Sequence, residues 1–238
     1  GAPPTELPIY SAMKVEPGEF LYLQMHYHMA EEPETDTTGL AIRWADEQPV
    51  REAYLKLWGN ASSSANGLQP GPNDSGASPE FVVPPGASDH TETMKYVWPT
   101  DFTRAEQVFL IANHMHYVGT EMKVWSEGEA NSCLLYTPNW DFDWQQIYTY
   151  DASKMNAPLI YPGDELWVEC TFDNTMDNAQ LVQSLKEVGE TEPVSVGLGE
   201  GSLDEMCLAL IGTVPEVDLD ASDASHVGTV SATVSVPG

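Results

Sequence analysis

The chain has 238 residues, 42% of them hydrophobic, so it can bury a core as one large domain or as one domain with part of another. Thirty-seven acidic against nine basic residues give a net charge of −28. Nucleic acid and anionic membrane surfaces are therefore excluded as expected partners, because both attract positive charge. The sequence contains no apolar run long enough to span a bilayer.

Short strands are expected along the whole chain, because 18 Gly and 18 Pro separate alternating or apolar runs. In chain order, the predicted strands cover residues 19–28, 39–45, 52–58, 80–83, 91–98, 107–117, 121–126, 132–136, 145–150, 165–172, 205–212 and 229–236. Helices are expected only as short pieces, such as residues 103–106 and 178–186. This pattern predicts an all-β protein, a jelly-roll-like antiparallel β-sandwich of about eight or nine main strands.

The three cysteines, Cys133, Cys170 and Cys207, cannot all pair within the chain because their number is odd. Cys170 and Cys207 both lie in strand-like runs, and a disulfide between them would fit an oxidising compartment. Cys133 would then be a free, buried thiol. The expected location is extracytoplasmic, meaning secreted or periplasmic.

Four of the six histidines form two His-x-His pairs, His26 with His28 and His114 with His116. Alternate residues of a strand point to the same face, so each pair places two imidazoles within reach of one metal ion. Met206, arriving from a second strand, would add a soft thioether that suits a copper ion able to hold Cu(I).

Other polar residues in these runs have simpler explanations than metal binding. His28 and His90 are expected mainly to make hydrogen bonds, although His90 could approach the first histidine pair, and His226 is expected to be solvated. Asp141 and Asp143 could form a metal or acid–base pair. They are more simply interpreted as turn carboxylates beside aromatic residues.

Several runs keep the order of motifs found in one enzyme family, from about residue 19 to about residue 213. They are Gln24-Met25-His26-Tyr27-His28, Thr38-Gly39-Leu40-Ala41-Ile42, Val83-Pro84-Pro85-Gly86, His114-Met115-His116, residues 139–148, Tyr161-Pro162-Gly163-Asp164 with Cys170-Thr171, and Asp204-Glu205-Met206-Cys207. Together they resemble the copper type II, ascorbate-dependent monooxygenases, which include the peptidylglycine α-hydroxylating and dopamine β-monooxygenases. The likeness is to the C-terminal domain of a bacterial-type member.

The resemblance implies that His114, His116 and Met206 are the catalytic ligands of an oxygen-binding copper. It also implies a disulfide between Cys170 and Cys207 that anchors the methionine strand. His26 resembles one ligand of a second, electron-donating copper. That site needs an adjacent histidine pair from the family's N-terminal domain, and this sequence contains no His-His dipeptide.

The same resemblance implies a domain organisation. Residues 1–30 would be the end of a truncated N-terminal monooxygenase domain, residues 31–215 the C-terminal copper monooxygenase sandwich, and residues 216–238 an acidic tail or terminal strand. The upstream domain is then an expected partner, and this part of the enzyme alone is expected to be inactive.

The implied activity is hydroxylation of an organic C–H bond with O2 and a reductant such as ascorbate. Two coppers serve the intact enzyme, and one complete site lies in this chain. Ala112 stands where the peptide-amidating enzyme has an arginine that grips the peptide carboxylate, and Leu208 and Leu210 stand where its partners are found. A peptide with a C-terminal glycine is therefore not the expected substrate, and the small organic substrate stays unidentified.

Two other functions are compatible with parts of this pattern. One is a non-catalytic copper-binding or adhesion module that kept the sandwich without the chemistry. The other is a carbohydrate-binding sandwich that uses exposed tryptophans, which would explain neither the His-x-His pair nor Met206.

Overall fold

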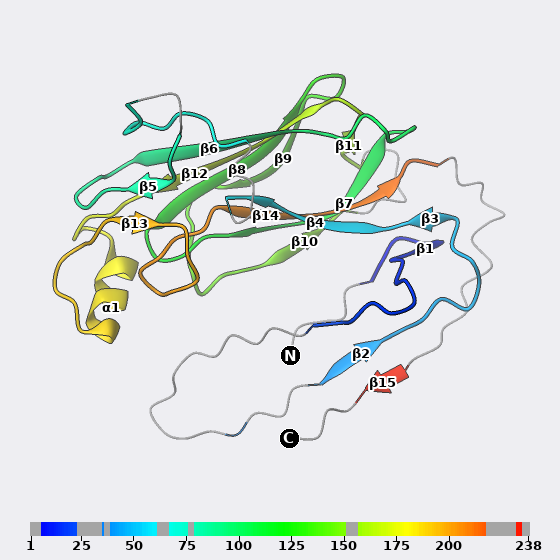
Figure 1. Ribbon diagram of the computed structural model, residues 1–238, viewed down its shortest axis with the longest axis horizontal. Helices are drawn as coiled ribbons and strands as arrows, with labels where there is room; N and C mark the ends of the chain where they lie inside the picture. Colours follow the sequence, from blue (N-terminus) through cyan, green and yellow to red (C-terminus); the bar gives the residue numbers. More distant parts are fainter. Residues whose placement is uncertain are drawn as a thin grey trace. The chain divides into compact units, whose positions relative to one another are not determined.

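Figure 1 shows the computed structural model, which describes residues 6–22, 35, 39–60, 67–75, 79–150, 157–217 and 232–234. Strands make up 40% of the structure, and the described part of the chain contains one short helix. The all-β prediction is therefore confirmed. The chain divides into two compact units, residues 1–53 with 218–238 and residues 54–217.

Residues 54–217 form two antiparallel sheets that enclose a common core (Figure 1). The five-stranded sheet has the order β10 (Ile147–Thr149), β7 (Glu106–His114), β14 (Leu208–Pro215) and β4 (Tyr54–Gly59), with β11 (Leu159–Ile160) also paired to β7. The four-stranded sheet has the order β6 (His90–Val97), β12 (Glu165–Phe172), β8 (Gly119–Glu127) and β9 (Ser132–Thr137). These sheets confirm the sandwich prediction.

The core follows from the period of two along the strands. In β12, Leu166, Val168, Cys170 and Phe172 are fully buried, while the residues between them are partly exposed. Hydrophobic side chains from β7 and β14 complete the cluster from the opposite sheet. The alternating pattern therefore determines which face of each strand points inward.

Smaller elements lie outside the two main sheets. Within residues 54–217 they are the ribbon of β5 (Val82–Val83) with β13 (Val196–Gly197) and the helix α1 (Ala179–Val188). In the other unit, β1 (Ser11–Ala12) pairs in parallel with β3 (Arg51–Glu52), and β2 (Leu40–Ile42) pairs with β15 (Ala232–Val234). No helix of the described residues is long and apolar enough to cross a membrane.

The single helix agrees with one of the two helical predictions. The Asn178 side chain caps its N-terminus by accepting hydrogen bonds from the backbone of Gln180 and Leu181, and Gly189 ends it with a φ of 82°. The other predicted helical piece, residues 103–106, is wrong. Ala105 accepts a backbone hydrogen bond from Glu216, and Glu106 begins β7, so sheet pairing replaces helix there.

Two strand boundaries near the candidate site differ from the prediction. β7 ends at His114, whereas the apolar pattern predicts a strand to residue 117. β14 begins at Leu208 and continues to Pro215, later than the predicted 205–212. Of the predicted strand 19–28, residues 19–22 form no strand and the others lie outside the described residues.

Candidate metal centre

His114 and His116 lie where β7 leaves the sheet and turns towards β8. Their ring centroids are 5.1 Å apart, and the ring planes are 78° apart. The strand ends at His114, so the two residues do not share one face of a continuous strand as predicted. The rings nevertheless come together, because the chain bends directly after the strand.

The orientation of the His114 ring is set by Gln145, which comes just before β10. His114 Nδ1 lies 2.7 Å from Gln145 Oε1. Gln145 Nε2 donates to the backbone carbonyl of Phe142 at 2.9 Å, so the amide oxygen is the atom that faces the histidine. Nδ1 therefore carries the proton and Nε2 carries the lone pair, which is the tautomer that binds metal through Nε2.

His116 is held in the same way by the backbone. Its side chain is nearly buried, and its Nδ1 lies 2.9 Å from the carbonyl oxygen of Asp204. A carbonyl oxygen only accepts, so Nδ1 again carries the proton. The Trp140 indole donates to the His116 carbonyl at 3.0 Å, which fixes the backbone as well as the ring.

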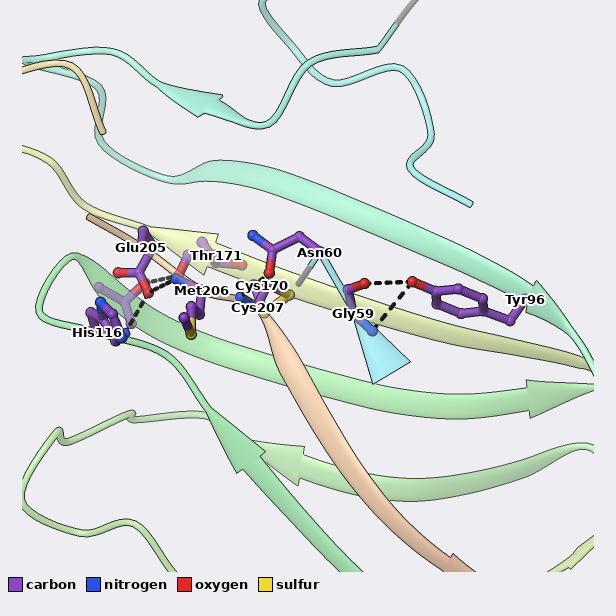
Figure 2. The surroundings of a disulfide bond; sticks show 10 residues. Gly59, Asn60, Tyr96, His116, Cys170, Thr171, Glu205, Met206 and Cys207 are labelled. Carbon is purple, nitrogen blue, oxygen red and sulfur yellow. Dashed lines mark hydrogen bonds between the residues drawn. A yellow bond between two sulfur atoms is a disulfide. The ribbon is translucent and has the colours of Figure 1, made fainter. Parts of the chain in front are cut away.

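Glu205 connects this histidine to the methionine run. Its carboxylate is fully buried, and Oε1 accepts hydrogen bonds from the backbone N–H of His116 and from that of Met206, the latter at 2.7 Å (Figure 2). Two donors that share one oxygen must be near neighbours. The half-buried Met206 is therefore placed beside His116.

The charge state of Glu205 reflects two opposing effects. Burial raises the pKa of its carboxyl to about 8, while the backbone N–H groups of His116, Met206, Val118 and Gly119 lower it. Among the described residues, Oε2 has no hydrogen-bond partner of good geometry. At neutral pH the protonated form is therefore favoured.

A disulfide between Cys170 in β12 and Cys207 confirms the predicted pairing and joins the two sheets next to Met206 (Figure 2). The backbone of Cys207 makes two hydrogen bonds with Asn60. Its N–H donates to Asn60 Oδ1 at 2.9 Å, and its carbonyl oxygen accepts from the Asn60 backbone N–H at 3.2 Å. Met206 thus lies between two fixed neighbours, Glu205 and Cys207.

Gly59 is required for this contact. Its φ is 143°, and a Cβ at this position would lie 2.0 Å from the Cys207 carbonyl oxygen. The Tyr96 hydroxyl donates to the Gly59 carbonyl at 2.6 Å (Figure 2). Strand β4 therefore approaches Cys207 more closely than any side chain would allow.

The free thiol is not where the sequence places it. Cys133 lies on β9 opposite Trp125 and is exposed, so the prediction of a buried thiol is wrong. The alternation of side chains along β9 turns Cys133 away from the core. The sequence around Cys133 does not show which face of this strand is the inner one.

The remaining candidate residues that the structure describes make contacts apart from the histidine pair. His26, His28 and His226 lie outside the described residues, so the partial second copper site stays a prediction. His90 is buried, with Nε2 2.7 Å from Glu92 Oε1. Asp141 Oδ1 accepts from the backbone of Asp143 at 2.9 Å, as a turn carboxylate does.

Among the described residues, no three His, Cys, Asp or Glu side chains are grouped closely enough to hold a metal ion. A site of two histidines and a methionine has only two ligands of these four residue types, so it does not form a group of three. The sequence reasoning missed Gln145 and gave Glu205 no role. The signal for Glu205 was its place in the Asp204-Glu205-Met206-Cys207 run, directly before the proposed ligand Met206.

Comparison with protein-family models finds no family that matches the chain. A search of curated proteins also finds no match. The class that the fold and the site define is an all-β sandwich protein with one inter-sheet disulfide and a histidine pair placed beside a methionine.

Proposed function

We propose that this chain is the oxygen-site domain of a copper-dependent monooxygenase that hydroxylates an organic C–H bond. His114, His116 and Met206 are the proposed ligands. The observation that supports this most directly is the shared tautomer of the two rings, because both Nδ1 atoms face oxygen acceptors at 2.7 and 2.9 Å. Histidines that bind metal through Nε2 are typically oriented by such acceptors.

The donor set suits copper rather than a hard cation. Imidazole nitrogens stabilise Cu(II), and a thioether favours Cu(I), so one site accommodates both oxidation states. When bound, copper would supply the redox centre that reacts with O2, with ascorbate or a similar reductant as the electron source. The chain's own contribution is to orient the rings through Gln145 and Asp204 and to position Met206 through Glu205 and Cys207.

An extracytoplasmic location and an upstream partner domain are parts of the proposed copper function. A buried disulfide is compatible with an extracytoplasmic location. The second copper would use His26 together with an adjacent histidine pair of an upstream domain. A parent gene that encodes such a domain would favour the enzyme over a copper-binding or adhesion module.

Copper titration of the apo protein tests the site. Cu(I) affinity is measured by competition with a chromophoric chelator, and Cu(II) affinity by fluorescence quenching. Met206→Ala is expected to weaken Cu(I) binding more than Cu(II) binding. His114→Ala removes a ligand and is expected to weaken both by at least about a hundredfold, since even the loss of an orienting partner costs about 10–100-fold.

Met176→Ala is the matched control, because Met176 is 52% exposed and lies in the turn between β12 and α1, outside the run that carries Met206. It is expected to leave both affinities unchanged. Wild-type copper binding in both Met206→Ala and His114→Ala would show that the site assignment is wrong.

A further inference from the structure

A cavity opens at the edge of the sandwich where β4 and β6 lie together. β4 is the last strand of the five-stranded sheet, and β6 is the last strand of the four-stranded sheet. The Trp58 ring of β4 and the Tyr96 ring of β6 have centroids 4.8 Å apart, so the two edge strands face each other here. Gly59, Tyr96 and neighbouring loop residues line a cavity of about 300 Å³. We call this space the edge cavity.

Most of the wall of the edge cavity is apolar. Met94 lines it and is 1% exposed, so the cavity reaches the core. Leu198 also lines it and is 48% exposed, so the cavity is open to solvent. The other apolar side chains of the wall are Leu68, Pro79, Phe81 and the ring of Tyr96. Ordinary packing leaves few spaces larger than a water molecule, whereas ligand sites are concave with mostly apolar walls.

The walls of the edge cavity are held in place without a ligand. Leu68 forms an antiparallel bridge with Met94, which attaches its loop to β6. The Phe81 ring meets the Phe172 ring of the core edge to face, with centroids 5.6 Å apart. A ligand that enters a preformed cavity does not have to order its walls, which reduces the entropic cost of binding.

The polar groups inside the edge cavity are already used. The Tyr96 hydroxyl donates to the Gly59 carbonyl at 2.6 Å and lies 3.2 Å from the Gly59 N–H, which donates to it (Figure 2). Asn60 Oδ1 accepts from the Cys207 N–H at 2.9 Å, and Asn60 Nδ2 is buried away from solvent. A ligand therefore finds apolar contacts there and no polar group that needs a partner.

Charge narrows the class of ligand further. Glu80 is exposed, so its carboxylate lies at the solvent side of the edge cavity. None of the described lining residues is Lys, Arg or His. An anion would meet a like charge at the entrance, and any ion would leave water for an apolar wall, which is unfavourable. Fatty acids and other anionic molecules are therefore disfavoured.

The volume sets the size of the ligand. An apolar cavity of about 150 Å³ holds one benzene molecule. The edge cavity has about twice that volume, so it fits a molecule of roughly ten non-hydrogen atoms. A folded protein partner is much larger than this space.

We propose that the edge cavity is a binding site for a small uncharged hydrocarbon-like molecule of about ten carbon atoms. The ligand contacts Met94 in the interior and Leu198 at the entrance. The described lining residues include none of the proposed copper ligands. This site is therefore additional to the proposed copper function and does not depend on it.

The test uses 1-fluoronaphthalene as the neutral probe and 4-fluoro-1-naphthoate as the anionic probe. Binding of each to the copper-free protein is measured by ¹⁹F relaxation. The anion is expected to bind at least about tenfold more weakly, because it must desolvate its carboxylate beside Glu80. Methionine labelled with ¹³C at the methyl group locates the neutral probe, since the aromatic ring shifts the signals of methyl groups that it contacts. The Met94 methyl is expected to shift and the Met206 methyl to stay unchanged, with Met94→Leu and Met206→Ala assigning the two signals.

A substitution at the entrance tests the location independently. Leu198→Ser is expected to weaken binding of 1-fluoronaphthalene by about fivefold, because part of the apolar contact is lost. Val194→Ser is the matched control. Val194 is 40% exposed, lies on the other side of β13 in the chain and is not among the described lining residues. The control is expected to bind the probe as the wild type does.

Three results would overturn the edge cavity as a ligand site. They are the absence of detectable binding of 1-fluoronaphthalene, wild-type binding of this probe by Leu198→Ser, and a shift of the Met206 methyl in place of the Met94 methyl. Equal binding of the anionic probe would contradict the uncharged class. All of these measurements use the copper-free protein, so failure of the copper proposal leaves them unaffected.

Discussion

The buried side chain of Glu205 accepts a hydrogen bond from the backbone N–H of His116, which lies 89 residues earlier in the chain. The same oxygen accepts from the backbone of Met206. A single acceptor atom thus sets the spacing between the turn that carries one imidazole and the run that carries the thioether. Its removal should affect the copper site even though Glu205 is not proposed as a ligand.

Glu205→Leu is expected to destabilise the protein by about 2–5 kcal/mol, because two buried N–H groups lose their acceptor. Glu205→Gln keeps one acceptor oxygen and should cost less. Urea unfolding of the apo protein gives both values. Cu(I) affinity should also fall more in Glu205→Leu than in Glu205→Gln. Equal stability and equal Cu(I) affinity of the two variants would contradict the positioning role of Glu205.

Loss of the Cys170–Cys207 disulfide should lower the free energy of unfolding by about 4 kcal/mol, as expected for a loop of 37 residues. The double variant Cys170→Ala with Cys207→Ala tests this in urea. Weaker Cu(I) binding is expected too, because Met206 directly precedes the bridge. Cys133→Ala serves as the control and should change neither quantity.

The buried His90–Glu92 pair predicts a pH dependence of stability. Burial, together with the charge of Asp74, raises the pKa of Glu92 to about 8, and burial lowers the pKa of His90. The folded protein therefore keeps a proton on Glu92 that the unfolded chain has lost above its ordinary pKa of 4.5. The free energy of unfolding should fall as pH rises towards 8, by at most about 1.4 kcal/mol per pH unit from this group.

Urea unfolding between pH 7 and 8 measures how the free energy of unfolding changes with pH. This window lies above the ordinary pKa of histidine, about 6.5, so His90 contributes little to the change. Glu92→Gln should reduce the slope, and the difference from wild type isolates Glu92 from Glu205, whose pKa is also raised to about 8. Parallel pH profiles for the two proteins would show that Glu92 is ionised in the folded state.

The exposed Cys133 should react with a thiol reagent such as 5,5′-dithiobis(2-nitrobenzoate) in the folded protein. One equivalent of thiol is expected, because the other two cysteines form the disulfide. Cys133→Ser should abolish the reaction under native conditions. A wild-type thiol that reacts only after unfolding would contradict the exposed position.

Strand content could be predicted from the sequence because alternation is a local property of the chain. The runs that became β6, β8, β9 and β12 match their predicted ranges closely. The two-residue strands β1, β11 and β13 could not be predicted, because so short a pairing leaves no pattern of its own. The boundary at His114 was missed for a different reason: the bend that follows is stabilised by Glu205, far along the chain.

The sequence by itself determined the all-β class, the close spacing of His114 and His116, and the odd count of cysteines, since each depends only on neighbouring residues or on composition. The tertiary structure decided which side of β9 exposes Cys133, which oxygens orient the two rings, and how Glu205 joins His116 to Met206. These contacts join residues separated by tens of positions. They form only when the two sheets pack, so no local pattern encodes them.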